Sequence, residues 1–197
     1  TRLIDLIGAS AYYIDIKTFH SYCFDLLGQV GNLEKTTDVI QEAIDLIRTH
    51  EADISKITKT VIVVDEAQDM SKQEYELIQV LNEYNEELRI IAVGDDDQNI
   101  YEFRGSSSEY LKQMIDDGAE SYELLINYRS KHNIVEFSNH IAETLEQRLK
   151  KTPIVSNTFE NGIIRMIEHD DEHLHVPIVK HFSSSKFEGS TAIMTRN

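Results

Sequence analysis

Two short apolar runs, each ending abruptly in acidic residues, constrain the fold of this 197-residue chain more than any other feature. Residues 60–64 stop at Asp65, and residues 89–93 stop at Gly94 and Asp95. Continuous hydrophobicity rich in β-branched residues is typical of strands buried on both faces, as in a parallel sheet covered by helices. We therefore expect both runs to be strands of such a sheet.

The segment between the two runs has the pattern of a helix. From Ser71 to Tyr84 the apolar residues recur at helical spacing, and Ser71 with Glu74 three residues later predicts a capped start. Strand, helix and strand in this order form a βαβ unit.

Elements on either side extend the α/β pattern. Before the first run we expect a weak strand at residues 12–16 and helices at 19–27 and 39–47. The pattern restarts after Gly118, which predicts a second α/β unit. Its expected elements are strands at 122–126, 162–167 and 191–194 and helices at 134–149 and about 172–182, the last with Pro177 delaying its regular part.

The acidic residues that follow the two strands are candidate ligands. Ligands of open α/β sheets bind at the carboxyl ends of the strands. Carboxylates placed there suit Mg²⁺, which takes oxygen ligands and keeps waters for a phosphate to replace. Glu66, beside Asp65, can orient or deprotonate a water. The alternative is that these acids are caps or solubilising groups: Asp69 can cap the following helix, and we expect at least one carboxylate of residues 95–97 to be solvated.

Four boxes in a fixed order resemble those of UvrD/Rep-type superfamily 1 DNA helicases. Residues 63–69 (VVDEAQD) are similar to the Walker B box, residues 94–105 (GDDDQNIYEFRG) to motif III, residues 125–130 (LINYRS) to motif IV and residues 18–21 (TFHS) to the TFHS box. The resemblance implies a RecA-like, P-loop NTPase fold with a parallel sheet and flanking helices, incomplete here, and the start of a second RecA-like unit. We expect residues 1–118 to be part of the first motor domain and residues 119–197 the first part of the second.

The resemblance also implies a role for each matching residue. The cofactors would be ATP and Mg²⁺, and the partner single-stranded DNA or a duplex with a single-stranded tail. Asp65 would bind Mg²⁺, Glu66 would activate water, and Gln98 would sense the γ-phosphate. From the second domain, Arg129 would act as an arginine finger and Tyr128 would stack on adenine. His20, Tyr101 and Phe103 would contact DNA, and Arg104 would couple motif III to the nucleotide.

Several of these residues also have ordinary structural interpretations. Phe103 and Tyr128 can be core aromatics, and Arg129 can be a surface ion-pair partner. His169, His173 and His175 have spacing compatible with a metal site, but capping explains this helix start better. Cys23 fits a buried helix position better than a nucleophile.

Composition narrows the class further. With 19 Lys and Arg against 35 Asp and Glu, the net charge is −16, which argues against holding nucleic acid by bulk electrostatics. Aromatic stacking, in contrast, needs no basic face. No apolar run is long enough to span a membrane, and the single cysteine fits a reducing cytoplasm.

The sequence also departs from the family. It has no Gly-x-x-x-x-Gly-Lys-Ser/Thr loop, so we expect this chain to be a middle portion of a 3′→5′ helicase that is inactive by itself. The segment between Ser21 and Thr60 is short for the family, and Glu102 replaces an often basic residue. The alternative is a helicase-like module without motor activity that binds DNA or docks proteins. Protein partners are not predicted.

Overall fold

The computed structural model describes residues 8–28, 39–99, 107–145, 148–166, 168, 173, 175–184 and 192. Three predicted site residues, Tyr101, Phe103 and Arg104, lie outside these described residues. All but one residue of the strand expected at 191–194 lies outside them as well.

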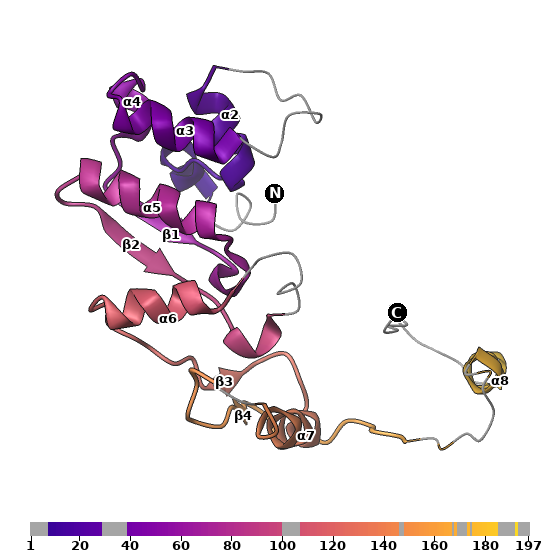
Figure 1. Ribbon diagram of the computed structural model, residues 1–197. Helices are drawn as coiled ribbons and strands as arrows, with labels where there is room; N and C mark the ends of the chain where they lie inside the picture. The colour runs from indigo at the N-terminus through magenta and orange to yellow at the C-terminus, as the bar shows by residue number, and fades with distance from the viewer. Residues whose placement is uncertain are drawn as a thin grey trace.

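A two-stranded parallel sheet lies at the centre of the first part of the chain (Figure 1). Strand β1 (Val61–Val64) pairs with β2 (Arg89–Ala92), and Val64 lies opposite Ala92. Helix α5 (Lys72–Tyr84) connects them. The predicted βαβ unit is therefore confirmed.

Helix α5 begins where the capping pattern predicts. The Glu74 backbone N–H donates to Ser71 Oγ at 3.3 Å, and the Ser71 N–H donates to Glu74 Oε2 at 2.8 Å. This reciprocal pair satisfies two backbone donors that the first helical turn leaves without partners. The helix start, and with it the direction in which α5 returns along the sheet, is thus encoded locally.

A helical layer packs against the outer side of α5. It contains helices α2 (Phe19–Leu26), α3 (Val39–Arg48) and α4 (Ile54–Ile57), and the 3₁₀ helix η1 (Gly8–Tyr13) precedes them in the chain. Helices α2 and α3 lie where the sequence predicts them. One side of α3 is buried in the core, where each large aliphatic side chain contributes about 1.5–3 kcal/mol; its buried residues are Val39, Ile40, Ala43, Ile44 and Ile47.

Only one face of this sheet is covered, so the expectation of burial on both faces is wrong. Val61, Val63 and Ile91 are 49%, 62% and 51% exposed, whereas Val64 is buried against α5. Successive strand residues point to opposite faces, and α5 covers only one of them. A continuous apolar run makes burial on both faces possible, but the second cover has to come from elsewhere, and the described residues do not supply it.

The strand expected at residues 12–16 is also wrong. Tyr12 and Tyr13 end η1 and are 95% and 92% exposed, and residues 14–18 have no regular structure. A strand needs a neighbour for its backbone hydrogen bonds, and no described strand pairs with this segment.

The second part of the chain is less regular than predicted. Helix α6 (Glu109–Asp116), which was not predicted, joins the first core through Tyr110, and a short parallel pair, β3 (Ile126–Asn127) and β4 (Val155–Ser156), follows. Helix α7 (His132–Ala142) packs on β4, and α8 (His175–Ser184) lies apart from the other elements (Figure 1).

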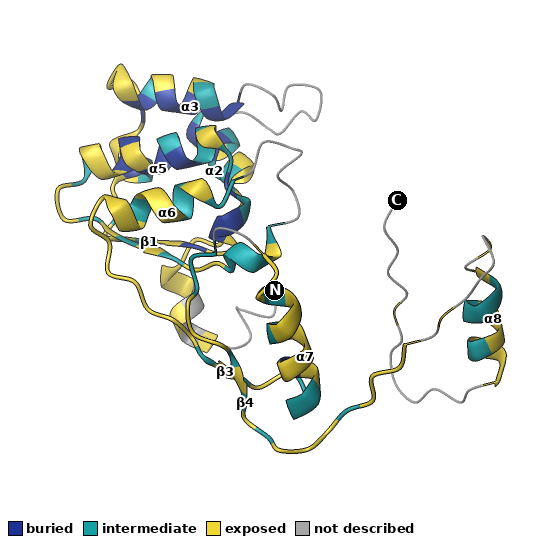
Figure 2. Cartoon of the chain, turned by 60° about the horizontal axis from the view of Figure 1, so that its bottom comes forward, coloured by how far each residue is buried: buried dark blue, intermediate teal, exposed yellow. Residues whose placement is uncertain are grey.

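Several expected boundaries in this part are therefore wrong. Of the strand expected at 122–126 only Ile126 is in β3, and the described residues of 162–167 form no strand. The helix expected to reach Leu149 ends at Ala142, whereas the last helix begins at His175, in agreement with the expected late start of its regular part. These segments bury little: α7 is mostly exposed, in contrast to α3 and α5 (Figure 2). Apolar pattern alone does not order a segment that lacks a packing partner.

Within the described residues, no helix is both long and apolar enough to cross a membrane.

Candidate functional site

The acidic segments that follow β1 and β2 lie at the same edge of the sheet. The Val93 N–H donates to the Val64 carbonyl at 2.8 Å, and the Ala67 N–H donates to the Val93 carbonyl at 2.9 Å. These bonds continue the ladder past the ends of both strands. The parallel order of β1 and β2 therefore brings Asp65 and Glu66 beside Asp95, as expected for the carboxyl edge of an α/β sheet.

Glu66 stands in an unusual backbone conformation at the turn after β1. Its φ of 52° and ψ of 43° lie in the left-handed region. Among the described non-glycine residues, only His50 also has a positive φ. Such a conformation costs about 1–3 kcal/mol and persists where the surroundings impose it. The chain turns here into the 3₁₀ helix η3 (Ala67–Asp69), and the Asp65 and Glu66 side chains are left exposed.

A buried glutamine connects the two acidic segments, and the sequence analysis did not identify it. Gln68 is 2% exposed; its Nε2 donates to Glu66 Oε2 at 2.8 Å, and its Oε1 accepts from the Asp95 N–H at 2.9 Å. Asp95 Oδ2 in turn accepts from Gln98 Nε2 at 2.6 Å. Glu66, Gln68, Asp95 and Gln98 thus form one hydrogen-bonded chain, which we call the Gln68 bridge. An amide is suited to this place because it donates at one end and accepts at the other.

Gly94 allows the Gln68 bridge to form. A Cβ atom at Gly94 would lie 2.7 Å from Gln68 Oε1 and 3.0 Å from the Gln68 backbone nitrogen. The first distance is shorter than real Cβ atoms show and the second is tight, so a side chain at this position would require Gln68 to shift. The glycine before the acidic run and the glutamine inside the first one are the sequence signals that point to this contact.

The three carboxylates of residues 95–97 are all engaged, so the expectation that at least one is solvated is wrong. Asp95 caps the 3₁₀ helix η4 (Asp96–Gln98) by accepting from the Asp97 N–H. None of the three residues is classed as exposed. Their partners include Arg148 and Lys150, from a segment more than 50 residues further along the chain. This contact was also missed, because opposite charges far apart in sequence give no local signal.

Asp69 does not cap helix α5, since Ser71 does. Its Oδ1 atom is the buried side-chain oxygen that has no hydrogen-bond partner among the described residues. Burial, and next the charge of Glu66, raises the pKa of the Asp69 carboxyl above its usual range.

The second-domain candidates are not brought to this edge. Tyr128 is 74% exposed, so it is not a core aromatic. Arg129 is exposed as well; its backbone N–H and that of Ser130 donate to Asn127 Oδ1, at 2.9 and 2.8 Å. This turn fixes the backbone beside Arg129, and within the described part of the chain its guanidinium makes no hydrogen bond to Glu66 or Gln98.

His20 lies in the first turn of α2 and is exposed. The preceding Thr18 caps that helix, because its side chain accepts from the Ser21 N–H at 3.2 Å. Cys23 is fully buried on the same helix, and burial, followed by the charge of Glu74, raises the pKa of its thiol to about 12. The core interpretation of Cys23 is thus supported, since a reactive cysteine needs an accessible thiolate.

A magnesium ion fits this edge only if waters and phosphates supply most of its ligands. The described residues contain no group of three or more His, Cys, Asp or Glu side chains placed to hold a metal. Mg²⁺ is often held by one or two carboxylates, several waters and substrate phosphates. The exposed Asp65 carboxylate is compatible with that arrangement, whereas Asp95 and Asp97 are occupied by cations.

Comparison with known proteins shows which proteins the segment around this edge is similar to. The UvrD/REP helicase N-terminal domain family matches residues 36–119, a range that contains β1, α5, β2 and both acidic segments. The resemblance predicted from the motifs is thereby confirmed: the chain carries UvrD/Rep-type helicase sequence.

Individual relatives are DNA helicases. DNA helicase II of Escherichia coli is 39% identical over 94 residues, which are 47% of this chain and 13% of that protein. DNA helicase II of Haemophilus influenzae is 40% identical over 91 residues, 46% of this chain and 12% of that protein. The ATP-dependent DNA helicase PcrA of Staphylococcus epidermidis is 32% identical over 141 residues, 68% of this chain and 19% of that protein. The chain thus spans less than a fifth of the length of each of these relatives.

Proposed function

We propose that this chain is part of an ATP-dependent DNA helicase or translocase, and that the edge formed by β1 and β2 is its nucleotide-hydrolysis site. The observation that carries the proposal is the Gln68 bridge, which joins Glu66 of the first acidic segment to Gln98 of the second. If the acidic residues only capped the helices that follow the strands, no continuous chain of hydrogen bonds between the two strand ends would be needed. The helicase names of the relatives support the same activity.

Asp65 and Glu66, at the end of β1, would have different roles in hydrolysis. Asp65 would hold Mg²⁺, and the ion would neutralise charge that develops on the phosphates. Glu66 would orient the attacking water and accept its proton, since its carboxylate is exposed while Gln68 fixes one of its oxygens at 2.8 Å.

Gln98 would report the state of the nucleotide to the rest of motif III. Its side-chain amide already bonds to Asp95, so movement of Gln98 toward a γ-phosphate would change the Gln68 bridge. Arg104, outside the described residues, would extend this coupling.

The second domain would complete the site by closing on it. Arg129 would stabilise transition-state charge as an arginine finger and Tyr128 would stack on the adenine; both are exposed, as groups that act across a domain gap must be. This division assigns residues 1–118 to the first RecA-like motor domain and residues 119–197 to the start of the second.

Single-stranded DNA, or a duplex with a single-stranded tail, would bind beside motif III. Tyr101 and Phe103 would stack on bases, each stack worth about 1–3 kcal/mol, and His20 would contact the strand. Stacking explains how a chain of charge −16 holds DNA without a basic face. Movement would run 3′→5′ as in the family, and a role in DNA repair in the cytoplasm follows from the same resemblance.

ATP hydrolysis by the full-length protein tests this function. We expect single-stranded DNA to stimulate hydrolysis by the full-length helicase, and the 197-residue chain, which lacks a Gly-Lys-Ser/Thr loop, to hydrolyse no ATP. A full-length protein that binds DNA without hydrolysing ATP would instead be a helicase-like module that binds DNA or docks proteins. Turnover by the 197-residue chain would contradict its predicted inactivity.

A further inference from the structure

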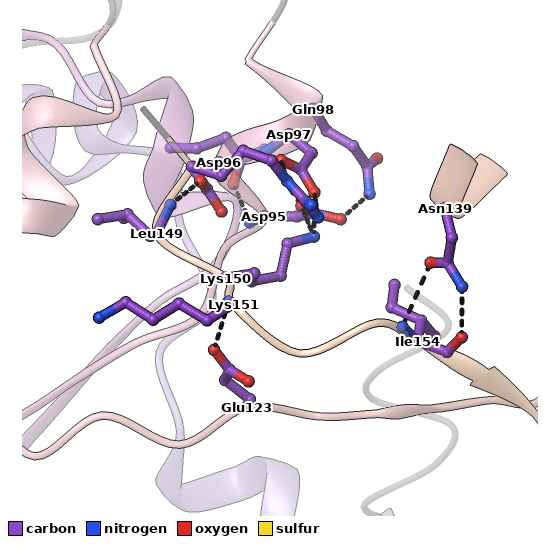
Figure 3. Close-up of polar contacts among 12 residues, drawn as sticks. Asp95, Asp96, Asp97, Gln98, Glu123, Asn139, Leu149, Lys150, Lys151 and Ile154 are labelled. Carbon is purple, nitrogen blue, oxygen red and sulfur yellow. Dashed lines mark hydrogen bonds and ion pairs between the residues drawn. The ribbon is translucent and has the colours of Figure 1, made fainter. Parts of the chain in front are cut away.

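Two basic side chains from the second part of the chain form ion pairs with carboxylates that follow β2. The Arg148 guanidinium places Nε 2.7 Å from Asp97 Oδ1 and Nη2 2.7 Å from Asp97 Oδ2, a bidentate fork. The Lys150 ammonium lies 2.9 Å from Asp97 Oδ2 and also contacts Asp95 Oδ1 (Figure 3). We call these four side chains the Asp97 clasp.

The backbone of the basic segment is held at the same place. The Leu149 N–H donates to Asp96 Oδ2 at 2.5 Å, and the Lys151 N–H donates to Glu123 Oε1 at 3.1 Å (Figure 3). The side chains of Arg148 and Lys150 and the backbone of Leu149 and Lys151 are therefore all held by carboxylates, and the segment is not merely a run of positive charge near an acidic one.

The Asp97 clasp is more shielded from water than the surface ion pairs of this protein. Arg148 and Asp97 are 21% and 13% exposed in their side chains, whereas Lys131 and Glu160 are 48% and 72% exposed. Exposed pairs contribute about 0–1 kcal/mol, but shielding and bidentate geometry strengthen a contact. Burial raises the pKa of the Asp97 carboxyl, yet the bonds from Arg148 and Lys150 outweigh burial and hold this pKa below its usual range.

The Asp97 clasp and the Gln68 bridge share one carboxylate. Asp95 Oδ1 accepts from Lys150, and Asp95 Oδ2 accepts from Gln98 Nε2 at 2.6 Å. The orientation of this carboxylate, and hence the position of Gln98, therefore depends on a cation that follows α7. A shift of the second part of the chain moves Lys150, and Gln98 loses the bond geometry that Asp95 provides.

We propose that Arg148 and Lys150 are positioning residues that fasten the second part of the helicase to motif III and hold Gln98 in place for ATP hydrolysis. The contact itself is independent of the proposed function, but the consequence for hydrolysis rests on it. Neither residue touches the reacting atoms; both act through Asp95 and Asp97.

The contact is tested in the 197-residue chain by the distance between two spin labels. Glu83→Cys on α5 and His140→Cys on α7 supply exposed labelling sites, and the buried Cys23 stays unlabelled. We expect one narrow distance distribution in this double-cysteine chain. Arg148→Glu should broaden it, and so should Lys150→Glu, while Lys151→Glu, the same change of charge on a neighbour that contacts Glu123 through its backbone, should not. A distribution that these substitutions leave narrow would overturn the contact.

The positioning role is tested by ATP turnover of the full-length helicase. We expect Arg148→Glu to lower kcat about tenfold to hundredfold with little change in the KM for ATP, because a misplaced group costs catalysis rather than binding. Arg148→Lys, which keeps a positive charge beside Asp97 but loses the bidentate fork, should recover part of the rate. Lys151→Glu is the matched control and should turn over at the unsubstituted rate.

The outcomes separate the two claims. An active helicase whose kcat is unaffected by Arg148→Glu overturns the positioning role alone. Absence of DNA-stimulated hydrolysis in the unsubstituted full-length protein overturns the proposed function and the positioning role together, while the spin-label distances still decide whether the Asp97 clasp exists.

Discussion

The first part of the chain, residues 8–117, and the second, residues 119–184, differ in how much they bury. Among the described residues every buried hydrophobic side chain except Val135 lies between Cys23 and Leu81. The second part leaves large apolar side chains open, with Leu124, Phe159 and Ile163 at 87%, 94% and 79% exposure. The first part therefore holds its site by its own core, whereas the second is placed largely by the Asp97 clasp.

This difference in burial separates the parts of the candidate site that the core holds in place from those that it does not. The Glu66 and Gln68 end of the Gln68 bridge follows a strand that is packed on α5, so the core sets its geometry, whereas the Gln98 end also depends on the contact of Lys150 with Asp95. Arg129 and Tyr128 follow a strand of two residues with little burial. In the proposed function these two residues close on a nucleotide, and a region with little burial suits such a movement because closure requires local freedom.

The largest effect should come from truncating the first core. Leu77 is 1% exposed on α5, and Leu77→Ala should lower the free energy of unfolding of this part by about 2–5 kcal/mol through lost burial and a residual cavity. Chemical denaturation followed by circular dichroism measures it. Ile163→Ala, at a 79% exposed site of the second part, is the control and should change little. Equal effects at both sites would remove the contrast between the two parts.

Elements whose packing partners are close in sequence were predicted well. The α5 cap, the βαβ unit and the buried side of α3 follow from local patterns that the core then uses. The predictions of a strand at 12–16 and of a helix end at Leu149 were wrong, because whether these segments become regular depends on packing partners that no local pattern specifies.

The same limit applies to the candidate site. Both acidic segments, Asp65 with Glu66 and the run containing Gln98, could be placed at one sheet edge from sequence, because parallel strands end together. The roles of Gln68, Arg148 and Lys150 could not, because a buried amide and a distant ion pair are recognised only once the fold brings them together.

A steric substitution in the Gln68 bridge should have the next largest effect. Gly94→Ala places a methyl group 2.7 Å from Gln68 Oε1 and 3.0 Å from backbone, which should cost about 1–3 kcal/mol of stability. Thermal unfolding of the 197-residue chain measures the loss. Gly162→Ala is the control, because the nearest atom to its added methyl group is the end of the Ile134 side chain rather than backbone. Gly28 is unsuitable as a control because its φ is positive. A Gly94→Ala chain as stable as the parent would show that the two segments are not packed as described.

Truncation at the small core of the second part should have a lesser effect. Val135 is 3% exposed on α7, and Val135→Ala removes two methyl groups, worth about 1.5 kcal/mol. Hydrogen exchange should rise for α7 amides and stay unchanged for α5. Faster exchange in α5 as well would mean that the two parts unfold as one unit.

Acid should loosen the Asp97 clasp before it affects the first core. The folded pKa of Asp97 lies below its ordinary value, so the stabilisation is complete above the ordinary pKa and is lost as the pH falls through the folded one. The distance distribution between labels on α5 and α7 should broaden below about pH 4. Asp97→Asn should give the broad distribution already at pH 7; a narrow one there would show that this carboxylate does not hold the contact.

The most direct test of the account is the rate of DNA-stimulated ATP hydrolysis by the full-length protein carrying Glu66→Gln, measured together with its affinity for ATP. Glutamine keeps the size of the side chain and a hydrogen bond to Gln68 but cannot accept a proton from water. We expect turnover to fall by at least about a hundredfold while nucleotide affinity stays within a few-fold of the unsubstituted protein. Turnover at the unsubstituted rate would contradict the assignment of this sheet edge as the hydrolysis site.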